Sequence, residues 1–486
     1  MAGGWLEVTA RFFGLETEFG VNLAGGELSP EEVARELFQP VVEWGRSTSV
    51  FTPAGGRLYL DVGSHPEYAT PECASLDDLV AHDAAGRLIM AGLTEWVNLH
   101  LQTKGQPGTV FLIANNNDSA GNSFGCHENY QINRAGADRV ARALIPFLVS
   151  RQILVGAGYV QVGAKGARFV LSQRADHVHE ATSSATTRAR PMINTRDEPH
   201  ADGAIARRLH VIVGDTSMCQ VTTRLKVGAT DLVLRALEQG QADPGLELVN
   251  PIQAIRQIAH AFVNQRPVKL TDGRSITAVD LQIEYLKLAE SVAQEADQPV
   301  IDLWRRGLES WQGLNFEPVA TELDWVIKHR LITRYQNRGG MSLLDPRIAR
   351  LELAYHDLGP TGLAARLQDS GAMAVAVAPK QAANAVLNPP AASRAKVRGA
   401  FIKAARRAGL DYSVDWTTLK LAASQGQASA ARAVKVMDPS GADAAPAWEL
   451  VASLQAQAIP QQTGCLDIIM DQAAAAPLDP GERLAG

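Results

Sequence analysis

The sequence is poor in cysteine and has no long hydrophobic run. It contains four cysteines, none of them in a Cys-x-x-Cys pair, at positions Cys73, Cys126, Cys219 and Cys465. This spacing indicates neither a structural zinc site nor a disulfide framework, so we expect reduced and mostly buried thiols. No segment approaches the roughly 20 consecutive apolar residues that span a bilayer, and residues 1–10 lack the pattern of a secretory signal. We therefore expect a cytoplasmic protein without a membrane partner.

A strong net charge is also missing, as are the common nucleotide-binding motifs. The chain carries 46 basic and 52 acidic residues, which gives a formal net charge of -6. Because phosphate backbones attract proteins with a cationic excess, we do not expect a nucleic-acid partner. Neither a Walker loop nor the glycine fingerprint of a Rossmann fold occurs, so a nucleotide site, if present, must be formed by other segments.

The length and composition are those of a globular protein with an extensive core. The chain has 486 residues, of which 46% are hydrophobic and 20% are charged. Strand-like and helical stretches alternate up to about Ala378, and a proline-containing interruption precedes a helical run at 396–408. We expect an α+β fold in which residues 1–390 form a large domain and residues 391–486 a small one. The Ala-rich end from Gln472 onward is predicted to be mobile.

The first strand-like run, residues 13–21, alternates with period two. Glu16 and Glu18 fall on one face, and the other face carries Phe13, Leu15, Phe19 and Val21. Two carboxylates at this spacing can each reach a hard cation, and magnesium with nucleotide phosphates is the usual partner of such ligands. The alternative is a half-exposed strand whose acids are solvated, as on the outer face of many antiparallel sheets.

A second run, residues 57–62, repeats the pattern. Arg57, Tyr59 and Asp61 share one face, and the aliphatic residues between them point into a core. Beyond a proline-marked bend, the segment that ends at Thr70 adds another carboxylate and a hydroxyl. Arg57 suits a phosphate because its guanidinium presents paired donors to oxyanions, although a surface salt bridge is the alternative.

Histidines lie on the polar faces of two further strand-like runs. His127 occupies the outer face of residues 124–130, and Arg208 and His210 share a face within residues 208–215. A neutral imidazole is a possible metal ligand. A hydrogen-bonded structural histidine and a solvated strand edge are the alternatives.

Together the four runs describe one sheet with an apolar face and a charged, concave face. Each run alone is weak evidence, but four runs that combine apolar residues with magnesium- or phosphate-competent groups make coincidence the poorer explanation. Residues 183–191 and 194–198 add hydroxyl groups and arginines in loop-like sequence, where anionic ligands are often held. The pattern therefore predicts a nucleotide and metal site on this face.

The amino-acid sequences of these segments closely resemble those of the Pup ligase family of glutamine-synthetase-like carboxylate-amine ligases. The resemblance is carried by residues 15–20, 57–70, 116–130 and 183–200, and it extends from about Arg11 to Pro439, including residues 411–416 and 419–421. It implies a glutamine-synthetase-like large domain, with a concave and mainly antiparallel sheet backed by helices, plus a small C-terminal domain. The Ala-rich extension after about Asp438 departs from the family pattern.

The resemblance also assigns roles to individual positions. The magnesium-binding positions of the family are matched by Glu16, Tyr59 and Glu67, its ATP-binding positions by Arg57, Thr70 and Trp416, and its catalytic base by Asp61. Strand alternation, together with analogy to the second metal site of glutamine-synthetase-like enzymes, adds the metal ligands Glu18, His127 and His210. Arg208, which shares a face with His210, is added as a nucleotide-binding residue.

The implied cofactors are ATP and Mg²⁺, and the implied partners are the prokaryotic ubiquitin-like protein Pup and lysine-bearing target proteins. In the family, the side-chain carboxylate of the C-terminal glutamate of Pup is activated as an acyl phosphate and joined to a target lysine. This isopeptide bond marks the target for proteasomal degradation.

Three alternatives to a Pup ligase remain open: a depupylase of the same family, a ligase for a small amino acid, and a vestigial nucleotide-binding scaffold. Depupylases resemble Gly-Thr-Glu-Val-Glu-Tyr-Gly at the first strand and carry an additional loop before the second. Here the first strand reads Leu-Glu-Thr-Glu-Phe-Gly, and 36 residues separate Gly20 from Arg57. The sequence of the first strand and the short spacing between the first two strands favour a ligase.

Overall fold

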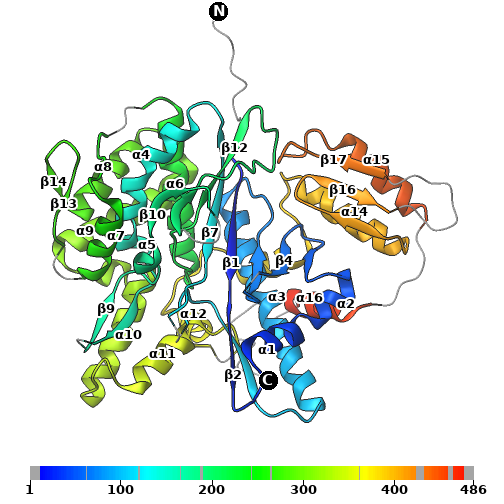
Figure 1. Ribbon diagram of the computed structural model, residues 1–486, viewed down its shortest axis with the longest axis horizontal. Coiled ribbons are helices and arrows are strands. Elements are labelled where there is room, and N and C mark those ends of the chain that lie inside the picture. The colour runs from blue at the N-terminus through cyan, green and yellow to red at the C-terminus, as the bar shows by residue number, and fades with distance from the viewer. Residues whose placement is uncertain are drawn as a thin grey trace, which may run out of the picture. The chain divides into compact units, whose positions relative to one another are not determined.

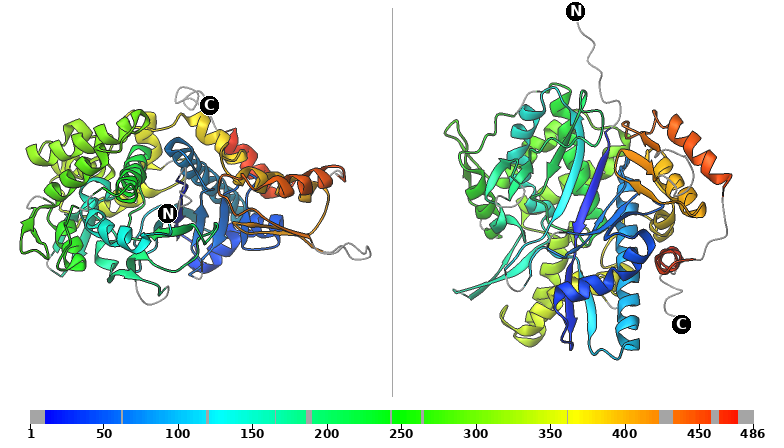
Figure 2. Two further views of the ribbon diagram at one scale, coloured as in Figure 1. Left: turned by 90° about the horizontal axis from the view of Figure 1, so that it is seen from above. Right: turned by 45° about the vertical axis from the view of Figure 1, so that its right-hand side comes forward.

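The computed structural model describes residues 11–61, 63–118, 121–164, 166–185, 190–241, 244–262, 265–360, 362–422, 432–457 and 463–475. Figures 1 and 2 show its helices and strands. The chain forms two compact units. Unit 1 contains the described parts of Met1–Leu112, Glu198–Arg208 and Val377–Gly486, and unit 2 contains those of Ile113–Asp197 and Leu209–Ala376. Each unit therefore combines segments that are far apart in the sequence.

The larger sheet of unit 1 has the strand order β1 (Phe13–Glu18), β5 (Pro66–Ala69), β4 (Arg57–Leu60) and β3 (Ser49–Phe51). All three pairs of neighbours are antiparallel. One face of this sheet is apolar, with the buried side chains Phe13, Leu15, Leu58 and Tyr68. The predicted period-two alternation is confirmed in both segments, although β1 ends at Glu18 and β4 ends at Leu60.

The long helix α3 (Leu76–Thr103) packs against β1 and β5. It begins where the Ser75 side chain accepts a hydrogen bond from the backbone N–H of Asp78, which is a common helix N-cap. Gly86 allows the close approach to the sheet, because a Cβ at this position would lie 2.1 Å from Cδ1 of Tyr68. The helix therefore supports the apolar face and leaves the opposite face of β1 and β5 for polar side chains.

The chain after Leu387 builds a small module with its own hydrophobic core. It contains α14 (Ala395–Arg407), an antiparallel sheet of β15 (Tyr412–Val414), β16 (Thr418–Leu421) and β17 (Arg432–Lys435), and α15 (Ala445–Gln455). Figure 2 shows the two helices beside these strands. The predicted helix at 396–408 is confirmed. The predicted domain boundary at residue 390 falls between α13 (Pro379–Leu387) and α14, and we retain it as a prediction.

A further helix, α16 (Cys465–Ala474), follows in the Ala-rich segment. It buries Leu466, Ile469 and Met470 and packs on α2 (Gln39–Gly45), α3 and α13. Residues 472–474 of the end predicted to be mobile form the last turn of this helix, since alanine favours helix and apolar residues before it are buried; the mobility of the end stays a prediction. Residues 476–486 lie outside the described part of the chain.

A second set of strands has the order β10 (Glu180–Ser183), β11 (Pro191–Asn194), β12 (Ala206–Val211) and β7 (Cys126–Asn133), and it belongs to unit 2 except for residues 206–208 of β12, which belong to unit 1. β10 and β11 are parallel, and β11 and β12 are antiparallel. Alternate residues of β7 are buried, as the sequence predicted. The helices α4 (Ala137–Ser150) and α6 (Gln220–Glu238) pack against β11 and β7, respectively.

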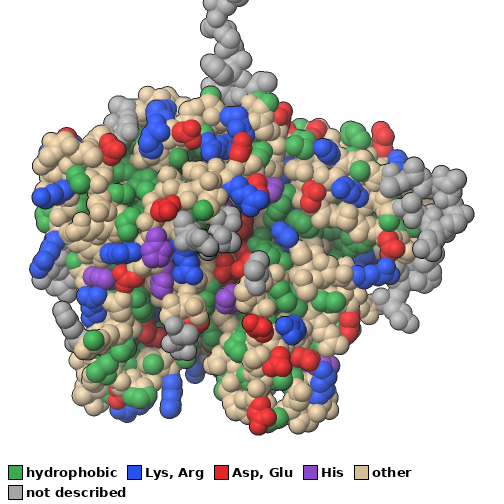
Figure 3. Space-filling model, viewed as in Figure 1, with side chains coloured by type: hydrophobic (Ala, Val, Ile, Leu, Met, Phe, Trp, Pro, Cys, Tyr) green, Lys and Arg blue, Asp and Glu red, His purple; other side chains and the backbone are tan. Residues whose placement is uncertain are grey.

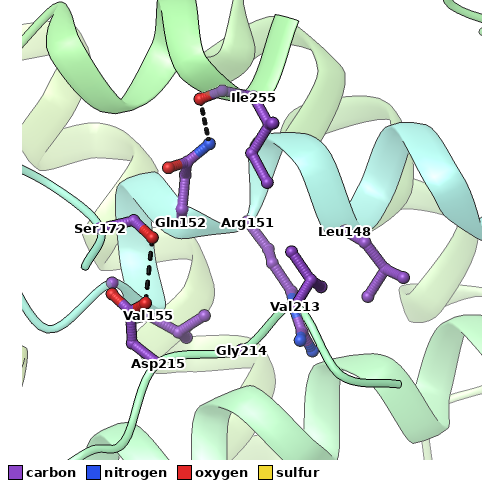
Figure 4. Close-up of a pocket in the computed structure, with 10 residues that line it drawn as sticks. Leu148, Arg151, Gln152, Val155, Ser172, Val213, Gly214, Asp215 and Ile255 are labelled. Carbon is purple, nitrogen blue, oxygen red and sulfur yellow. Dashed lines mark hydrogen bonds between the residues drawn. The ribbon is translucent and has the colours of Figure 1, made fainter. Parts of the chain in front are cut away.

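A buried ion pair joins these layers of unit 2. Arg151 donates hydrogen bonds of 2.5 and 2.8 Å to the two carboxylate oxygens of Glu128, and it also donates to Thr230 at 2.7 Å. Burial by itself raises the pKa of Glu128, but Arg151 lowers it below its ordinary value, so the carboxylate is ionised. Arg151 also lines a cavity of about 20 Å³, where Ser172 donates a hydrogen bond to Asp215 (Figure 4).

Replacement of Glu128 by Ala is expected to reduce the free energy of unfolding by about 3–5 kcal/mol, because it leaves the buried Arg151 without a counter-charge. Chemical denaturation measures this loss. Glu284→Ala is the matched control, since Glu284 forms an exposed pair with Lys287 and its loss is expected to cost less than about 1 kcal/mol. Equal losses in the two variants would contradict the assigned role of the buried pair.

The remaining elements complete the two units. Unit 1 also contains α1 (Pro30–Leu37), α2 (Gln39–Gly45), α13 (Pro379–Leu387) and β2 (Gly20–Ala24), which pairs with β6 (Thr109–Ile113). The other helices and strands, in chain order, are α5 (Gln152–Val155), β8 (Tyr159–Gly163), β9 (Gly166–Val170), η1 (Ala175–His177), α7 (Pro251–His260), β13 (Val268–Lys269), β14 (Ser275–Ile276), α8 (Ala278–Glu290), η2 (Glu295–Asp297), α9 (Gln298–Gly313), η3 (Glu317–Val319), α10 (Asp324–Gly339), α11 (Pro346–His356) and α12 (Leu363–Asp369).

These elements confirm the predicted α+β class with mainly antiparallel strand pairing. The prediction of free and mostly buried thiols is also confirmed, since three of the four cysteines are buried and Cys465 is exposed. Within the described residues, none of the helices combines the length and the hydrophobicity needed to cross a membrane.

Candidate active site

The polar face of the unit 1 sheet brings three predicted metal-site residues into one row. In the register of the sheet, Glu18 of β1 lies opposite Glu67 of β5, and Glu67 lies opposite Tyr59 of β4. The next row along the strands contains Glu16 and Arg57, with the small side chain of Ala69 between them. Figure 3 shows acidic side chains gathered where Figure 1 labels β1. The alternation predicted for each strand thus becomes one continuous polar surface.

The carboxylates of this surface repel one another. Burial, followed by the charges of Glu16 and Glu18, raises the pKa of Glu67 well above its ordinary value. Burial, followed by the charges of Glu16 and Glu67, raises the pKa of the Tyr59 hydroxyl, which is hydrogen-bonded to Glu67. A divalent cation would relieve this repulsion, and carboxylate oxygens are its preferred ligands. The donor set therefore fits magnesium.

Two arginines border the carboxylates. The guanidinium of Arg57 lies 4.5 Å from the centroid of the Tyr59 ring and donates to the Ser49 hydroxyl through Nε at 2.9 Å and Nη2 at 2.8 Å. Arg208 lies 3.7 Å from a carboxylate oxygen of Glu16 and 3.1 Å from one of Glu198. These contacts hold two cationic groups beside the acids, an arrangement suited to a ligand that carries both phosphates and metal ions.

Asp61 lies just beyond β4 rather than within a strand. Its backbone N–H donates to the carbonyl of His65 at 3.0 Å, and the N–H of Ser64 donates to the carbonyl of Asp61 at 2.8 Å. The turn explains why the strand predicted for residues 57–62 ends early, since Ser64 adopts a left-handed conformation with φ of 59°. Asp61 and His65 of this turn lie near Glu18 of β1, since one potential ligand atom of each residue lies within 4.8 Å of the other two.

The predicted nucleotide-binding residue Thr70 is 3% exposed, and its hydroxyl accepts a hydrogen bond from the backbone N–H of Leu15 at 3.0 Å. Gly14 leaves room for this contact, because a Cβ there would lie 3.2 Å from Oγ1 of Thr70. Thr70 therefore fastens the end of β5 to β1. Its contact with ATP stays a prediction.

Trp416 lies in the turn between β15 and β16 and is partly exposed. The carboxylate of Asp415 forms this turn by accepting hydrogen bonds from the backbone N–H groups of Thr417 and Thr418, at 2.8 and 2.7 Å. The indole contacts Phe51 of β3 edge to face, with ring centroids 4.9 Å apart. Trp416 is therefore held beside the sheet that carries Arg57.

The two predicted histidine ligands belong to unit 2 and lie together there. His127 of β7 and His210 of β12 have ring centroids 5.0 Å apart and an interplanar angle of 76°. Their outward direction on the strands is as predicted, because their neighbours Cys126, Leu209 and Val211 are buried. Their role as metal ligands stays a prediction.

The sequence as a whole decides the family. The profile of the family described as "Pup-ligase protein" matches residues 11–420. The chain belongs to the Pup ligase family. It is 53% identical over 426 residues to the Pup–protein ligase of Xylanimonas cellulosilytica. It is 51% identical over 421 residues to that of Mycolicibacterium smegmatis, and each alignment covers 85% of this chain and 93% of the relative.

Solved structures of Pup ligases share the fold. The complex between Pup and its ligase PafA superposes with a TM-score of 0.87 at 37% identity and covers 93% of both chains. The Pup ligase PafA in complex with ADP gives a TM-score of 0.80 at 39% identity, over 90% of this chain and 96% of the other. The resemblance inferred from sequence segments is therefore confirmed over nearly the whole chain.

Sequence reasoning missed three residues that the structure places beside the Pup ligase positions. His65 follows Asp61 in the turn. Glu72 accepts a hydrogen bond from Arg398 of α14, and the ring centroids of His200 and Trp416 lie 6.1 Å apart. His65 had a local signal, since it stands between two predicted site residues. Glu72 and His200 had none, because their partners are distant in the sequence.

Proposed function

We propose that this chain is an ATP-dependent ligase that joins Pup to lysines of target proteins and thereby marks them for proteasomal degradation. The observation that carries the proposal is the row of Glu18, Glu67 and Tyr59, beside Glu16 and Arg57, in a member of the Pup ligase family. The similarity to a Pup ligase solved with ADP supports ATP as the nucleotide. We place the reaction in the cytoplasm.

In the proposed first step, the side-chain carboxylate of the C-terminal glutamate of Pup attacks the γ-phosphorus of ATP. The products are a glutamyl phosphate and ADP. Magnesium, held by Glu16, Glu18 and Glu67, would neutralise phosphate charge and stabilise the transferring phosphoryl group. Tyr59, His127 and His210 are the further proposed metal ligands, and Arg57 and Arg208 are assigned to the phosphates.

In the proposed second step, the target lysine attacks the acyl carbon and expels phosphate. A free lysine has a pKa of about 10.4, so its ammonium must lose a proton before it can attack. Asp61 is assigned as the acceptor of this proton, and its position in a turn, next to the carboxylate row, gives it access to a side chain entering from solvent. Thr70 and Trp416 are assigned to ATP binding.

Trapping of the acyl phosphate tests this reaction without a target protein. Hydroxylamine is uncharged near neutral pH and attacks acyl phosphates directly. We expect the enzyme, with Pup, ATP and Mg²⁺, to form a hydroxamate at the C-terminal glutamate of Pup, which mass spectrometry detects. Omission of ATP or Mg²⁺ should abolish the product. ATP-independent hydroxamate formation, or none under complete conditions, would contradict the proposed first step.

A further inference from the structure

A buried ion triad lies beneath Trp416. The carboxylate oxygen Oε1 of Glu72 accepts hydrogen bonds from Nε of Arg394 at 2.8 Å and from Nη2 of Arg398 at 2.5 Å. Both arginines are 2% exposed. Burial by itself raises the pKa of Glu72, but Arg398 and Arg394 lower it to about 2, so the carboxylate is ionised at neutral pH. Burying two guanidinium groups on one carboxylate has a large desolvation cost, so a gain in stability does not by itself explain the triad. A role in positioning other residues would account for it.

Each arginine of the triad holds one aromatic residue by its backbone. Arg398 donates to the carbonyl of Trp416 at 3.0 Å, and its guanidinium lies 5.1 Å from the indole centroid. Arg394 donates to the carbonyl of His200 at 2.5 Å. Glu72 thus holds two aromatic residues from different segments of unit 1, one through each arginine.

Trp416 and His200 are both partly exposed, and their ring centroids lie 6.1 Å apart at an interplanar angle of 44°. His200 has a φ of 48°, in the left-handed region that residues other than glycine rarely adopt. Backbone strain of this kind persists where surrounding contacts enforce it, and it is frequent at ligand sites. The hydrogen bond from Arg394 to the His200 carbonyl is such a contact.

The electrostatics of His200 suit an uncharged planar ligand. Burial, followed by the charges of Arg208 and Arg394, lowers the pKa of His200 to about 4, so its imidazole is neutral at physiological pH. An indole and a neutral imidazole offer apolar ring surface for stacking and a ring nitrogen for a hydrogen bond. A purine base has both features.

We propose that His200 contacts the adenine base of ATP beside Trp416, which the family resemblance already assigns to ATP, and that Glu72 is a positioning residue that holds both through Arg394 and Arg398. The inference rests on the proposed function, which makes ATP the nucleotide. It adds His200 as a base-contacting residue and gives the triad a role in nucleotide recognition. Glu72 lies two positions after Thr70, so the end of β5 connects the residues proposed to contact the adenine base with the polar face proposed to bind the phosphates.

Comparison of two ligands distinguishes a loss of adenine recognition from a loss of folding or of phosphate binding. We would measure the affinity of the enzyme for MgATP and for magnesium tripolyphosphate, which has the phosphates but no base. His200→Ala and Glu72→Gln are each expected to weaken ATP binding about tenfold or more, which corresponds to the loss of one stacking contact, and to leave tripolyphosphate binding unchanged. Equal losses for both ligands, or no loss for ATP, would overturn the inference.

Asp297→Asn is the matched control, because Asp297 forms a comparable paired contact with Arg235 in unit 2, with an N–O distance of 2.6 Å. It should leave the ratio of the two affinities unchanged. If Glu72→Gln does not fold, His200→Ala decides the outcome, since His200 is partly exposed. Failure of the proposed function would appear separately, as the absence of ATP binding and hydroxamate formation in the unaltered enzyme.

Discussion

Replacement of Asp61 by Asn is expected to abolish conjugation of Pup to target lysines while ATP binding persists. The amide keeps the shape of the side chain and the turn made by its backbone, but it cannot accept the lysine proton. Loss of a general base typically costs about 10²–10⁴-fold in rate. A gel assay of conjugate formation at saturating ATP measures the rate, and nucleotide titration measures binding.

The same variant should still form the hydroxamate of Pup, because hydroxylamine needs no base to remove a proton before attack. This contrast assigns Asp61 to the second step rather than to phosphoryl transfer. Asp77→Asn, which changes an exposed carboxylate at the start of α3, is the control and should conjugate at the normal rate. Conjugation by Asp61→Asn at the unaltered rate across neutral pH would show that another group is the base.

Replacement of Glu67 by Gln is expected to raise the magnesium concentration needed for ATP binding by about 10–100-fold. Glu67 stands at the centre of the carboxylate row, between Glu18 and Tyr59, so its loss removes a charged ligand and disturbs the orientation of its neighbours. Titration of magnesium at fixed ATP, with bound nucleotide as the readout, measures the shift. Glu16→Gln should act in the same direction.

Glu36→Gln is the control for these variants, because Glu36 of α1 forms a surface ion pair with Lys104, the residue that follows α3. It should leave the magnesium titration unaltered. Titrations of Glu16→Gln and Glu67→Gln that coincide with that of the unaltered enzyme would mean that both carboxylates are merely solvated, as the alternative interpretation of the strands holds.

The direction of side chains along single strands could be predicted from the sequence, whereas contacts between strands could not. Period two placed Glu16 with Glu18 on one face of their strand and Arg57 with Tyr59 on one face of theirs, because alternation is a local property of extended chain. That Glu67 pairs with Glu18 depends on the register between distant segments, which is set by packing against α3. The carboxylate row therefore appears only in the structure.

Two features were not predicted from the sequence, the early end of the strand before Asp61 and the triad around Glu72, and each has a physical cause. Asp61 continues the alternation of residues 57–60, but the left-handed Ser64 closes a turn before a longer strand can form. The triad of Glu72, Arg394 and Arg398 could not be predicted from the sequence pattern, because its members meet only when the start of α14 contacts the segment after β5. Buried polar networks of this kind are tertiary features.

A two-arm assay measures whether this chain forms isopeptide bonds between Pup and lysines. One arm contains Pup ending in glutamate, a lysine-bearing protein, ATP and Mg²⁺, and the other contains a pre-made Pup conjugate with the same ATP and Mg²⁺. Gel separation and mass spectrometry follow both arms. We expect conjugate to form faster than it is cleaved when ATP is plentiful. Rapid cleavage with negligible conjugation would contradict the ligase assignment.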